Sequence, residues 1–159
     1  MEENRLKDLY LDRQICFLLY AASRQATKVY GPLLKELDIT YPQYLVLLVL
    51  WEHKEMKVSE IGNLLMLESN TLTPLLKRLE QRGFVFRLRS NTDERCVTIS
   101  LTENGEKLKS KACTIPGKIA DAFVDDSVSI PELQTFQKTL AKVVKVLHEK
   151  NTMLADSEL

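Results

Sequence analysis

Apolar and polar positions follow helical spacing across residues 69–82, the most strongly patterned stretch of the chain. The apolar positions stand at i, i+3, i+4 and i+7, and they are Leu72, Leu75, Leu76 and Leu79. This spacing predicts a helix with one apolar stripe and an opposite polar face. Pro74 is expected within its first turn or so, where a missing N–H group costs little. Gly83 follows the last periodic residue, a position where glycine commonly ends a helix.

A basic hairpin follows this predicted helix. Residues 84–89 and 97–101 have the composition of two strands, and the polar residues 90–95 between them predict a tip. A shorter helix is predicted at 57–65, and the turn 66–68 separates it from the patterned helix. Two helices joined by a short turn and followed by a hairpin predict a winged helix-turn-helix.

Long helices are predicted before this module. Residues 6–30 contain neither proline nor glycine, which predicts one helix with a broad apolar face. Gly31 and Pro32 are expected to interrupt it, and Pro32 can open a short new helix at 33–37. Residues 41–53 predict another helix, which is apolar nearly all round and therefore expected at the centre of the fold. Its core candidates include Leu45, Leu48, Val49 and Trp51.

Two more helices are predicted after the hairpin. The first covers about residues 102–122 with a notch at Pro116-Gly117, and the second covers about 131–150. The apolar positions on the inner side of the last helix are Leu133, Phe136, Leu140, Val143, Val144 and Leu147. These positions predict an amphipathic helix whose apolar face needs a partner.

The pattern predicts a mainly α fold with a small β-hairpin wing. We expect one domain over residues 1–159, with the winged helix-turn-helix at about 42–101 and dimerisation helices at about 6–38 and 103–150. A second copy of the chain is the simplest partner for the end helices, so a symmetric homodimer is expected. Such a dimer places two recognition helices roughly 34 Å apart, which predicts an inverted-repeat DNA operator.

The charge distribution favours a DNA-binding surface on this module. The formal net charge is zero, which counts mildly against a nucleic-acid-binding protein. However, residues 77–95 carry six basic side chains against three acidic ones. A neutral chain with one basic surface can still bind DNA through that surface.

Composition excludes several other classes. The cysteines at positions 16, 96 and 113 match no zinc spacing, and no cofactor or metal is expected. The acidic start of the chain lacks the apolar core of a signal peptide. The longest apolar run, 44–51, is too short to span a membrane. We therefore expect a cytoplasmic protein with thiols that start out reduced.

Polar side chains of the patterned helix are candidates for DNA contacts. The candidates for the major groove are Ser69, Asn70, Thr71, Thr73, Lys77 and Arg78. Arg87 and Arg89 in the first hairpin strand are candidates for phosphate contacts. The plainer interpretation of the helix is a solvated face without a partner.

Several motifs carry a family resemblance. The first group is Ser69-Asn70-Thr71-Leu72-Thr73-Pro74-Leu75-Leu76-Lys77-Arg78-Leu79-Glu80, with Asp93-Glu94-Arg95 and Ser100-Leu101-Thr102 in the hairpin. These residues resemble the MarR family of dimeric winged-helix regulators across nearly the whole chain. The second group is Gln14-Ile15-Cys16-Phe17-Leu18-Leu19-Tyr20, Tyr30 and Thr40-Tyr41-Pro42-Gln43-Tyr44-Leu45. It resembles the OhrR-type subgroup of organic-hydroperoxide-sensing repressors, which usually shows Asp-Ser-Gly where this chain has Glu68-Ser69-Asn70.

The resemblance implies a redox sensor at Cys16. Only a thiolate attacks a peroxide, and a free cysteine with a pKa near ~8.5 is mostly protonated, so hydroxyl donors near the sulfur would help. Tyr20 lies one turn from Cys16, whereas Tyr30 lies about 21 Å further along a helix. The resemblance therefore implies that Tyr30 and Tyr41 reach Cys16 from the other subunit. The alternatives are an inert buried cysteine and ordinary interface tyrosines.

The resemblance also implies the switch. Oxidised Cys16 would form a sulfenic acid and condense with a thiol, either a small molecule or Cys113 of the partner, and the sequence leaves both open. Reduced protein would repress, and oxidised protein would release DNA. Cys96 is interpreted as a wing residue without a redox role. Arg95 resembles the family's minor-groove arginine, and Asp93 would brace the hairpin.

Three other functions compete with this hypothesis. A MarR-type repressor could be released by a non-covalent phenolic ligand bound near residues 41–51. A thiol peroxidase could turn over at Cys16, although such an enzyme would not need a basic wing, and we expect no enzyme. An interaction scaffold on a winged-helix frame would bind no DNA.

Overall fold

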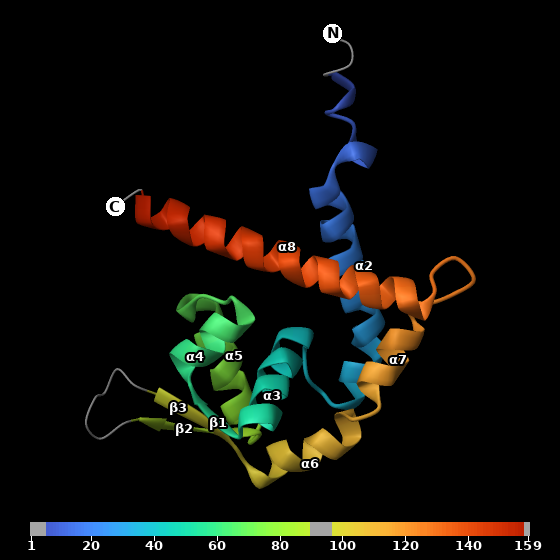
Figure 1. Cartoon of the computed structure of the whole chain (residues 1–159). Coiled ribbons are helices and arrows are strands. Elements are labelled where there is room, and N and C mark those ends of the chain that lie inside the picture. Colours follow the sequence, from blue (N-terminus) through green and yellow to red (C-terminus); the bar gives the residue numbers. More distant parts are fainter. Residues whose placement is uncertain (1–5, 90–96, 158–159) are drawn as a thin grey trace. The chain divides into compact units, whose positions relative to one another are not determined.

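The computed structural model describes residues 6–89 and 97–157 of the chain (Figure 1). The chain divides into two compact units, Met1–Ile115 and Pro116–Leu159, and each is described by itself. In chain order the elements are η1 (Leu11–Arg13), α2 (Ile15–Glu36), α3 (Tyr41–His53), β1 (Glu55–Lys57), α4 (Val58–Leu65), α5 (Ser69–Gln81), β2 (Val85–Arg89), β3 (Val97–Leu101), α6 (Glu103–Ala112), α7 (Ile115–Asp121) and α8 (Ile130–Ser157). The predicted mainly α fold with a small β-hairpin wing is confirmed.

The helix-turn-helix and the two hairpin strands lie where the sequence predicts them. Helices α4 and α5 are separated by a turn in which Met66 adopts the left-handed conformation. Helix α5 buries Leu72, Leu76 and Leu79, three of its four periodic leucines. The prediction for Pro74 was wrong, because this residue lies in the second turn of α5. The carbonyl of Asn70 loses its N–H donor there, but Asn70 and Pro74 are both exposed, so water can replace the donor.

The sheet has a third strand that the sequence did not predict. Strand β1 pairs antiparallel with β3, and β3 pairs with β2, so the order is β1-β3-β2. Ile99 at the centre of β3 is fully buried, with Met56 and Arg87 as its cross-strand neighbours. Strand β1 is only three residues long and pairs with residues more than 40 positions later, so no local sequence pattern predicts this strand.

Helix α3 is the central element of the first unit. It contacts α2, α4, α5, α6 and the strands β1 and β3 (Figure 1). The buried apolar residues are Tyr44, Val46, Leu47, Leu50 and Trp51. The prediction of a central helix is confirmed, but Leu48 was a wrong core candidate, since it is 39% exposed. A helix that is apolar all round has no polar face to orient it, so periodicity could not select the buried positions.

Helix α2 differs from the prediction at both ends. The predicted helix over 6–30 is broken at Gln14, and α2 begins at Ile15. The predicted interruption at Gly31-Pro32 is wrong, because α2 continues through Pro32 to Glu36. Proline removes one backbone hydrogen bond and crowds the carbonyl four residues earlier. Both Pro32 and Lys28 are exposed, so that carbonyl can turn to water, while buried Leu34 anchors the following turn.

The hairpin leads into α6, and the next helix starts after a break. The predicted helix over 102–122 consists of α6 and α7, and the break at residues 113–114 precedes Pro116. Thr102 caps α6, because its hydroxyl accepts a hydrogen bond from the Gly105 N–H at 3.0 Å. Pro116 lies in the first turn of α7, where its missing N–H group costs little, so the proline opens a second helix and does not notch a longer one.

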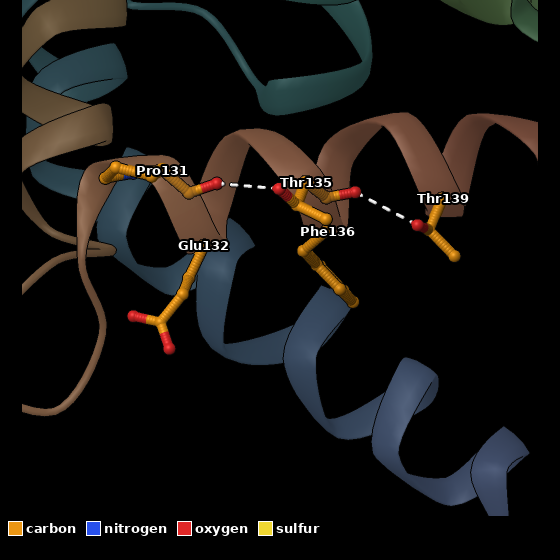
Figure 2. A pocket seen from close by; sticks show the side chains of 5 residues that line it. All are labelled: Pro131, Glu132, Thr135, Phe136 and Thr139. Carbon is orange, nitrogen blue, oxygen red and sulfur yellow. Dashed lines mark hydrogen bonds between the residues drawn. The ribbon is translucent and has the colours of Figure 1, made fainter.

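Helix α8 dominates the second unit and is longer than predicted. Ser129 and Glu132 form a reciprocal cap at its start, since the Ser129 N–H donates to the Glu132 carboxylate at 2.9 Å. Leu133, Leu140 and Val143 are half-buried, whereas Phe136 and Leu147 are half exposed. A pocket along α8 is lined by Pro131, Glu132, Thr135, Phe136 and Thr139 (Figure 2). Its two threonine hydroxyls donate to the helix backbone, at 2.9 and 3.0 Å, and Phe136 is the largest apolar side chain in its lining.

Among the described residues, no helix is long and apolar enough to cross a membrane.

Candidate functional site

The exposed face of α5 presents the polar side chains that the sequence predicted for DNA contacts. Ser69, Asn70, Thr71, Lys77 and Arg78 are exposed, and Thr73 is half-buried. The opposite face is held in the core by its leucines. This arrangement exposes hydroxyl, amide and cationic groups of the kinds that contact nucleic acids.

The start of α5 holds Asn70 in a defined orientation. The Asn70 side-chain amide donates to the carboxylate of Glu68 at 3.2 Å. The Thr71 hydroxyl in turn donates to the Asn70 carbonyl at 3.1 Å. Glu68, where the OhrR-type subgroup usually has aspartate, therefore orients the neighbouring asparagine.

The end of α5 is tied to the segment that follows α2. Arg82, which follows the last residue of α5, forms an ion pair with the carboxylate of Asp38. Its guanidinium carbon also lies 5.9 Å from the centre of the Phe84 ring. Asp38 has the left-handed backbone conformation just after α2 ends. These contacts connect one end of the recognition helix to one end of α2.

The wing points its first arginine inward. Arg87 lies on the same side of β2 as buried Val85, and its guanidinium is 3.6 Å from the carboxylate of Glu80 on α5. Its Nε is buried and has no hydrogen-bond partner among the described residues. Arg87 therefore braces the wing against α5, and its predicted phosphate contact stays a prediction. The side chain of Arg89 and all of Asp93, Arg95 and Cys96 lie outside the described residues.

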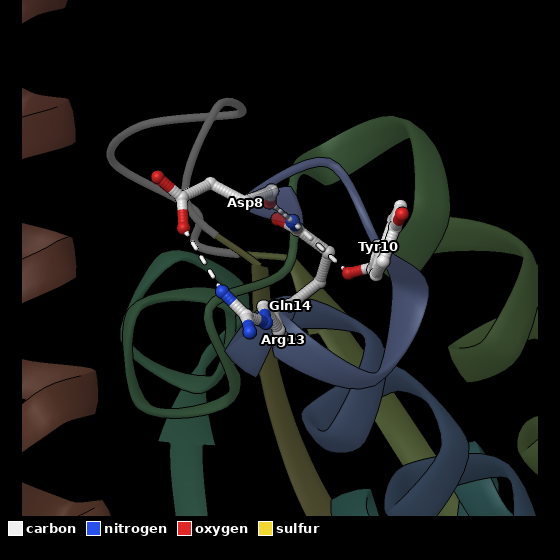
Figure 3. A network of polar contacts seen from close by, with 4 residues as sticks. All are labelled: Asp8, Tyr10, Arg13 and Gln14. Carbon is white, nitrogen blue, oxygen red and sulfur yellow. Dashed lines mark hydrogen bonds and ion pairs between the residues drawn. The ribbon is translucent and has the colours of Figure 1, made fainter. Parts of the chain in front are cut away.

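Cys16 is the second residue of α2 and is exposed in the isolated chain. The break that places it there is held by Gln14, whose side-chain amide donates to the backbone carbonyls of Asp8 and Tyr10 (Figure 3). Arg13 pairs with the Asp8 carboxylate at 3.5 Å in the same network. The first turn of a helix carries unpaired N–H groups and favours a nearby negative charge. Sequence analysis missed this position because it placed Cys16 in the middle of a longer helix.

Tyr20 lies one turn beyond Cys16 and is exposed. Its hydroxyl oxygen accepts a hydrogen bond from the guanidinium of Arg24 at 2.7 Å. The guanidinium carbon of Arg24 lies 5.5 Å from the centre of the Tyr20 ring. Arg24 was not predicted as a site residue, although its spacing of four from Tyr20 was a usable signal.

Tyr30 and Tyr41 contact each other rather than Cys16 of the same chain. Their ring centres are 4.7 Å apart, and Tyr44, which the sequence did not single out for the site, lies 5.8 Å from Tyr30. Burial raises the pKa of Tyr30, and the neighbouring hydroxyls of Tyr41 and Tyr44 raise it further. Burial also raises the pKa of Tyr44, with a contribution from Tyr41. The raised pKa values keep the phenols of Tyr30 and Tyr44 protonated and able to donate hydrogen bonds.

Cys113 caps the end of α6 and is also exposed. Its thiol lies 3.0 Å from the carbonyl of Ser110, to which it can donate. Cys16 and Cys113 are both free thiols. Within residues 6–89 and 97–157, no cluster of histidine, cysteine and carboxylate side chains could hold a metal ion.

Comparison with known proteins places the chain in a family. Residues 28–112 match the family model described as "Transcriptional regulator SarA/Rot". The chain is 50% identical over 149 residues to the organic hydroperoxide resistance transcriptional regulator of Bacillus subtilis (strain 168). This alignment covers 94% of the chain and 99% of the relative.

Solved structures agree with this assignment. The structure of reduced AbfR bound to DNA is similar with a TM-score of 0.76 and 36% identity, over 94% of this chain and 98% of that one. The structure of disulfide-formed AbfR is similar with a TM-score of 0.62 and 38% identity, over 94% and 99%. The chain therefore belongs to the MarR family of winged-helix transcriptional regulators, within its OhrR-type branch.

Proposed function

We propose that this protein is a DNA-binding repressor that senses organic hydroperoxides through Cys16 and releases its operator when Cys16 is oxidised. The observation that carries the proposal is the exposed thiol at the first turn of α2, on a chain whose recognition helix presents an open polar face. The kinship with a regulator named for organic hydroperoxide resistance supports the choice of signal.

The proposed reaction is a two-electron oxidation of the sulfur. The Cys16 thiolate attacks the outer oxygen of the hydroperoxide, so that an S–O bond forms and the O–O bond breaks. The sulfur becomes a sulfenic acid, and the peroxide leaves as an alkoxide that takes up a proton to become an alcohol. The sulfenic acid then condenses with a second thiol to give a disulfide and water.

The tyrosine cluster would support the thiolate from the partner subunit. Tyr30 lies fourteen residues beyond Cys16 on a continuous helix, about 21 Å away, so it cannot reach the thiol of its own chain. In a symmetric homodimer, Tyr30 and Tyr41 of one chain would meet Cys16 of the other. The phenol of Tyr30, whose pKa is raised by burial, and the phenol of Tyr41 would donate to the sulfur, and Tyr20 would donate from the same chain.

Two thiols compete to resolve the sulfenic acid. Cys113 is exposed and free, and a similar protein has been solved in a disulfide form, which supports resolution by the partner's Cys113. A small cellular thiol is the alternative. Intact mass after stoichiometric hydroperoxide separates them: a covalent dimer supports Cys113, and a small-thiol adduct supports the alternative.

On DNA, a dimer would read an inverted repeat with its two α5 helices. The exposed α5 side chains Ser69, Asn70, Thr71, Lys77 and Arg78 would enter the major groove, with Thr73 at the edge of this surface. Arg95 at the wing would reach the minor groove, with Asp93 bracing it, and Arg89 would meet phosphates. A bulky group on Cys16 at the dimer interface would change the spacing of the two recognition helices and prevent simultaneous docking.

A mobility-shift titration of Cys16→Ser tests the proposal. The variant should bind operator DNA like reduced wild type and remain bound after cumene hydroperoxide, whereas wild type should be released. Cys113→Ser removes the other described thiol and keeps Cys16, so the peroxide should still oxidise Cys16 in this variant. Release of Cys16→Ser by the peroxide would reject Cys16 as the sensor.

We infer that Cys16 reports a signal and does not turn over as an enzyme, since the relatives are transcriptional regulators. Peroxide consumption is measured with a thiol reductant present, and multiple-turnover consumption there would support a thiol peroxidase instead.

A further inference from the structure

The second residue of α5, Asn70, is exposed and is held in one orientation by its neighbours. Its amide nitrogen donates to the Glu68 carboxylate at 3.2 Å, and its carbonyl oxygen accepts from the Thr71 hydroxyl at 3.1 Å. A carboxylate has only acceptors, so the amide nitrogen must face Glu68. Exchanging the two ends of the amide would place its oxygen against the carboxylate, and both hydrogen bonds would be lost. The orientation of the Asn70 amide is therefore defined before any DNA is bound.

The oriented amide of Asn70 retains one donor and one acceptor. An asparagine side chain carries two N–H donors and an oxygen with two lone pairs. The two contacts use one of each, and the side chain has no other partner among the described residues. In the major groove, adenine presents the complementary pair, an N7 acceptor beside an N6 amino donor. Guanine presents two acceptors there, so one of them would face the amide oxygen without a hydrogen bond.

Asn70 also lies at the part of a recognition helix that meets bases. In helix-turn-helix proteins, the N-terminal residues of the second helix contact base edges in the major groove. The opposite side of α5 is fixed in the core by buried Leu72 and Leu76. A carboxylate at this place repels phosphates and lowers the affinity for every sequence alike. The contact of Glu68 with Asn70 gives that carboxylate a role in selectivity instead.

We propose that Asn70 is a specificity-determining residue that reads one adenine in each operator half-site, and that Glu68 and Thr71 are positioning residues that hold its amide. The Asn70 oxygen accepts from the adenine N6 amino group, and its free N–H donates to N7. This inference rests on the proposed reading of an inverted repeat by α5. It does not depend on the oxidation of Cys16.

The test begins with selection of binding sites from a pool of random DNA duplexes, with wild type and Asn70→Ala under a thiol reductant. The wild-type consensus should contain one adenine per half-site that the Asn70→Ala consensus lacks, with the other positions shared. Replacing that A·T pair by G·C in one half-site should weaken wild-type binding roughly tenfold. The same replacement should change the binding of Asn70→Ala by less than about twofold.

Two variants of Glu68 separate positioning from charge. Glu68→Ala frees the Asn70 amide to rotate, and the preference for A·T over G·C should fall to about threefold or less. Glu68→Gln removes the same charge but keeps an oxygen that accepts from Asn70, so the wild-type preference should remain. Asn63→Ala is the matched control, because Asn63 is an exposed asparagine on α4, and this variant should also keep the preference.

An unchanged consensus for Asn70→Ala, or the loss of a base other than adenine, would overturn the reading by Asn70. Equal preferences in Glu68→Ala and Glu68→Gln would overturn the positioning role of Glu68. Circular dichroism of each variant checks that the fold is kept. If wild type enriches no sequence at all, the operator binding itself fails together with this inference. The sensor function fails separately, if Cys16→Ser is still released from DNA by peroxide.

Discussion

At the scale of single residues, the tyrosine cluster shows how burial sets chemistry. Tyr30 packs against Tyr41 and Tyr44 in the first unit, and removal of its hydroxyl from water is the largest cause of its raised pKa. The phenolate form is disfavoured there, because it would be both poorly solvated and close to two other phenols. Such hydroxyls remain donors over the whole physiological range of pH.

This environment makes stability depend on alkaline pH. Both states keep Tyr30 protonated below about pH 10, the pKa of an unfolded tyrosine. Above that value the unfolded state loses its proton first, so the contribution of Tyr30 to stability is lost as the pH rises through its higher folded pKa. Tyr30→Phe should therefore show a smaller fall in the free energy of unfolding between pH 8 and about pH 11, measured by urea denaturation.

An exposed tyrosine supplies the control for this prediction. Tyr10 is 56% exposed, and Tyr10→Phe removes its hydroxyl. The free energy of unfolding of this variant should fall at alkaline pH as much as that of wild type does. Identical declines in wild type and Tyr30→Phe would contradict the argument from burial.

At the scale of elements, α6 packs closely against Phe84, the residue that precedes β2. A Cβ atom on Gly105 would lie 2.1 Å from the carbonyl oxygen of Phe84 and 3.0 Å from a methyl carbon of Leu101. Neither side can withdraw, because the Phe84 carbonyl accepts from the Thr102 N–H at 3.0 Å and the Gly105 carbonyl accepts from the Trp51 indole at 2.9 Å. The wing, α3 and α6 are therefore joined where only glycine fits.

Gly105→Ala should destabilise the protein strongly. The overpacking is expected to lower the free energy of unfolding by about 3 kcal/mol, measured by urea denaturation. Gly117→Ala is the matched control, because its added methyl group meets nothing within 4 Å in α7. This control should gain up to about 1 kcal/mol from helix propensity. Equal stability of the two variants would show that the α6 contact can relax.

Elements were predicted well where the signal was local. The leucine stripe and Gly83 located α5, and strand-type composition on both sides of a polar tip located β2 and β3, because each element carries its own signal. Strand β1 was missed because its only signal is a partner more than 40 residues away. Helix α2 continues through Pro32 because the neighbouring residues are exposed and Leu34 is buried. Exposure and burial are set by the fold and cannot be read from the local sequence.

The sequence named candidate residues for the site but did not predict how they are arranged. Cys16, Tyr20 and the polar face of α5 were identified from motifs. The position of Cys16 at a helix start depends on side-chain contacts of Gln14 to backbone carbonyls, and the inward turn of Arg87 depends on Glu80. Such contacts become visible only when the chain is folded.

At the scale of the whole molecule, the ends of the chain expose more apolar surface than a monomer needs. Exposed apolar side chains before and along α2 include Leu9, Leu11, Ile15 and Leu18, and those of α8 include Ile130, Phe136, Val146 and Leu147. Surfaces of this kind commonly mark an interface. They support the proposed homodimer, in which the two α5 helices would face one DNA.

A charge on α8 should therefore disrupt the dimer. Phe136→Lys is expected to shift the protein toward monomer in analytical ultracentrifugation and to weaken operator binding at least about tenfold, since one half-site alone remains bound. Leu64→Lys on α4 is the matched control, because Leu64 is 54% exposed and Phe136 is 51% exposed. The dimer proposal is wrong if both variants sediment as wild type does.

The unbroken course of α2 has a mechanical consequence. Its 22 residues make a continuous helix about 33 Å long, with Cys16 in the first turn and Asp38 two residues past the last. Asp38 forms an ion pair with Arg82, which follows the last residue of the recognition helix α5. A break at Pro32 would have absorbed any tilt of the end that carries Cys16, whereas a continuous helix passes that tilt on to the part of the protein that holds DNA.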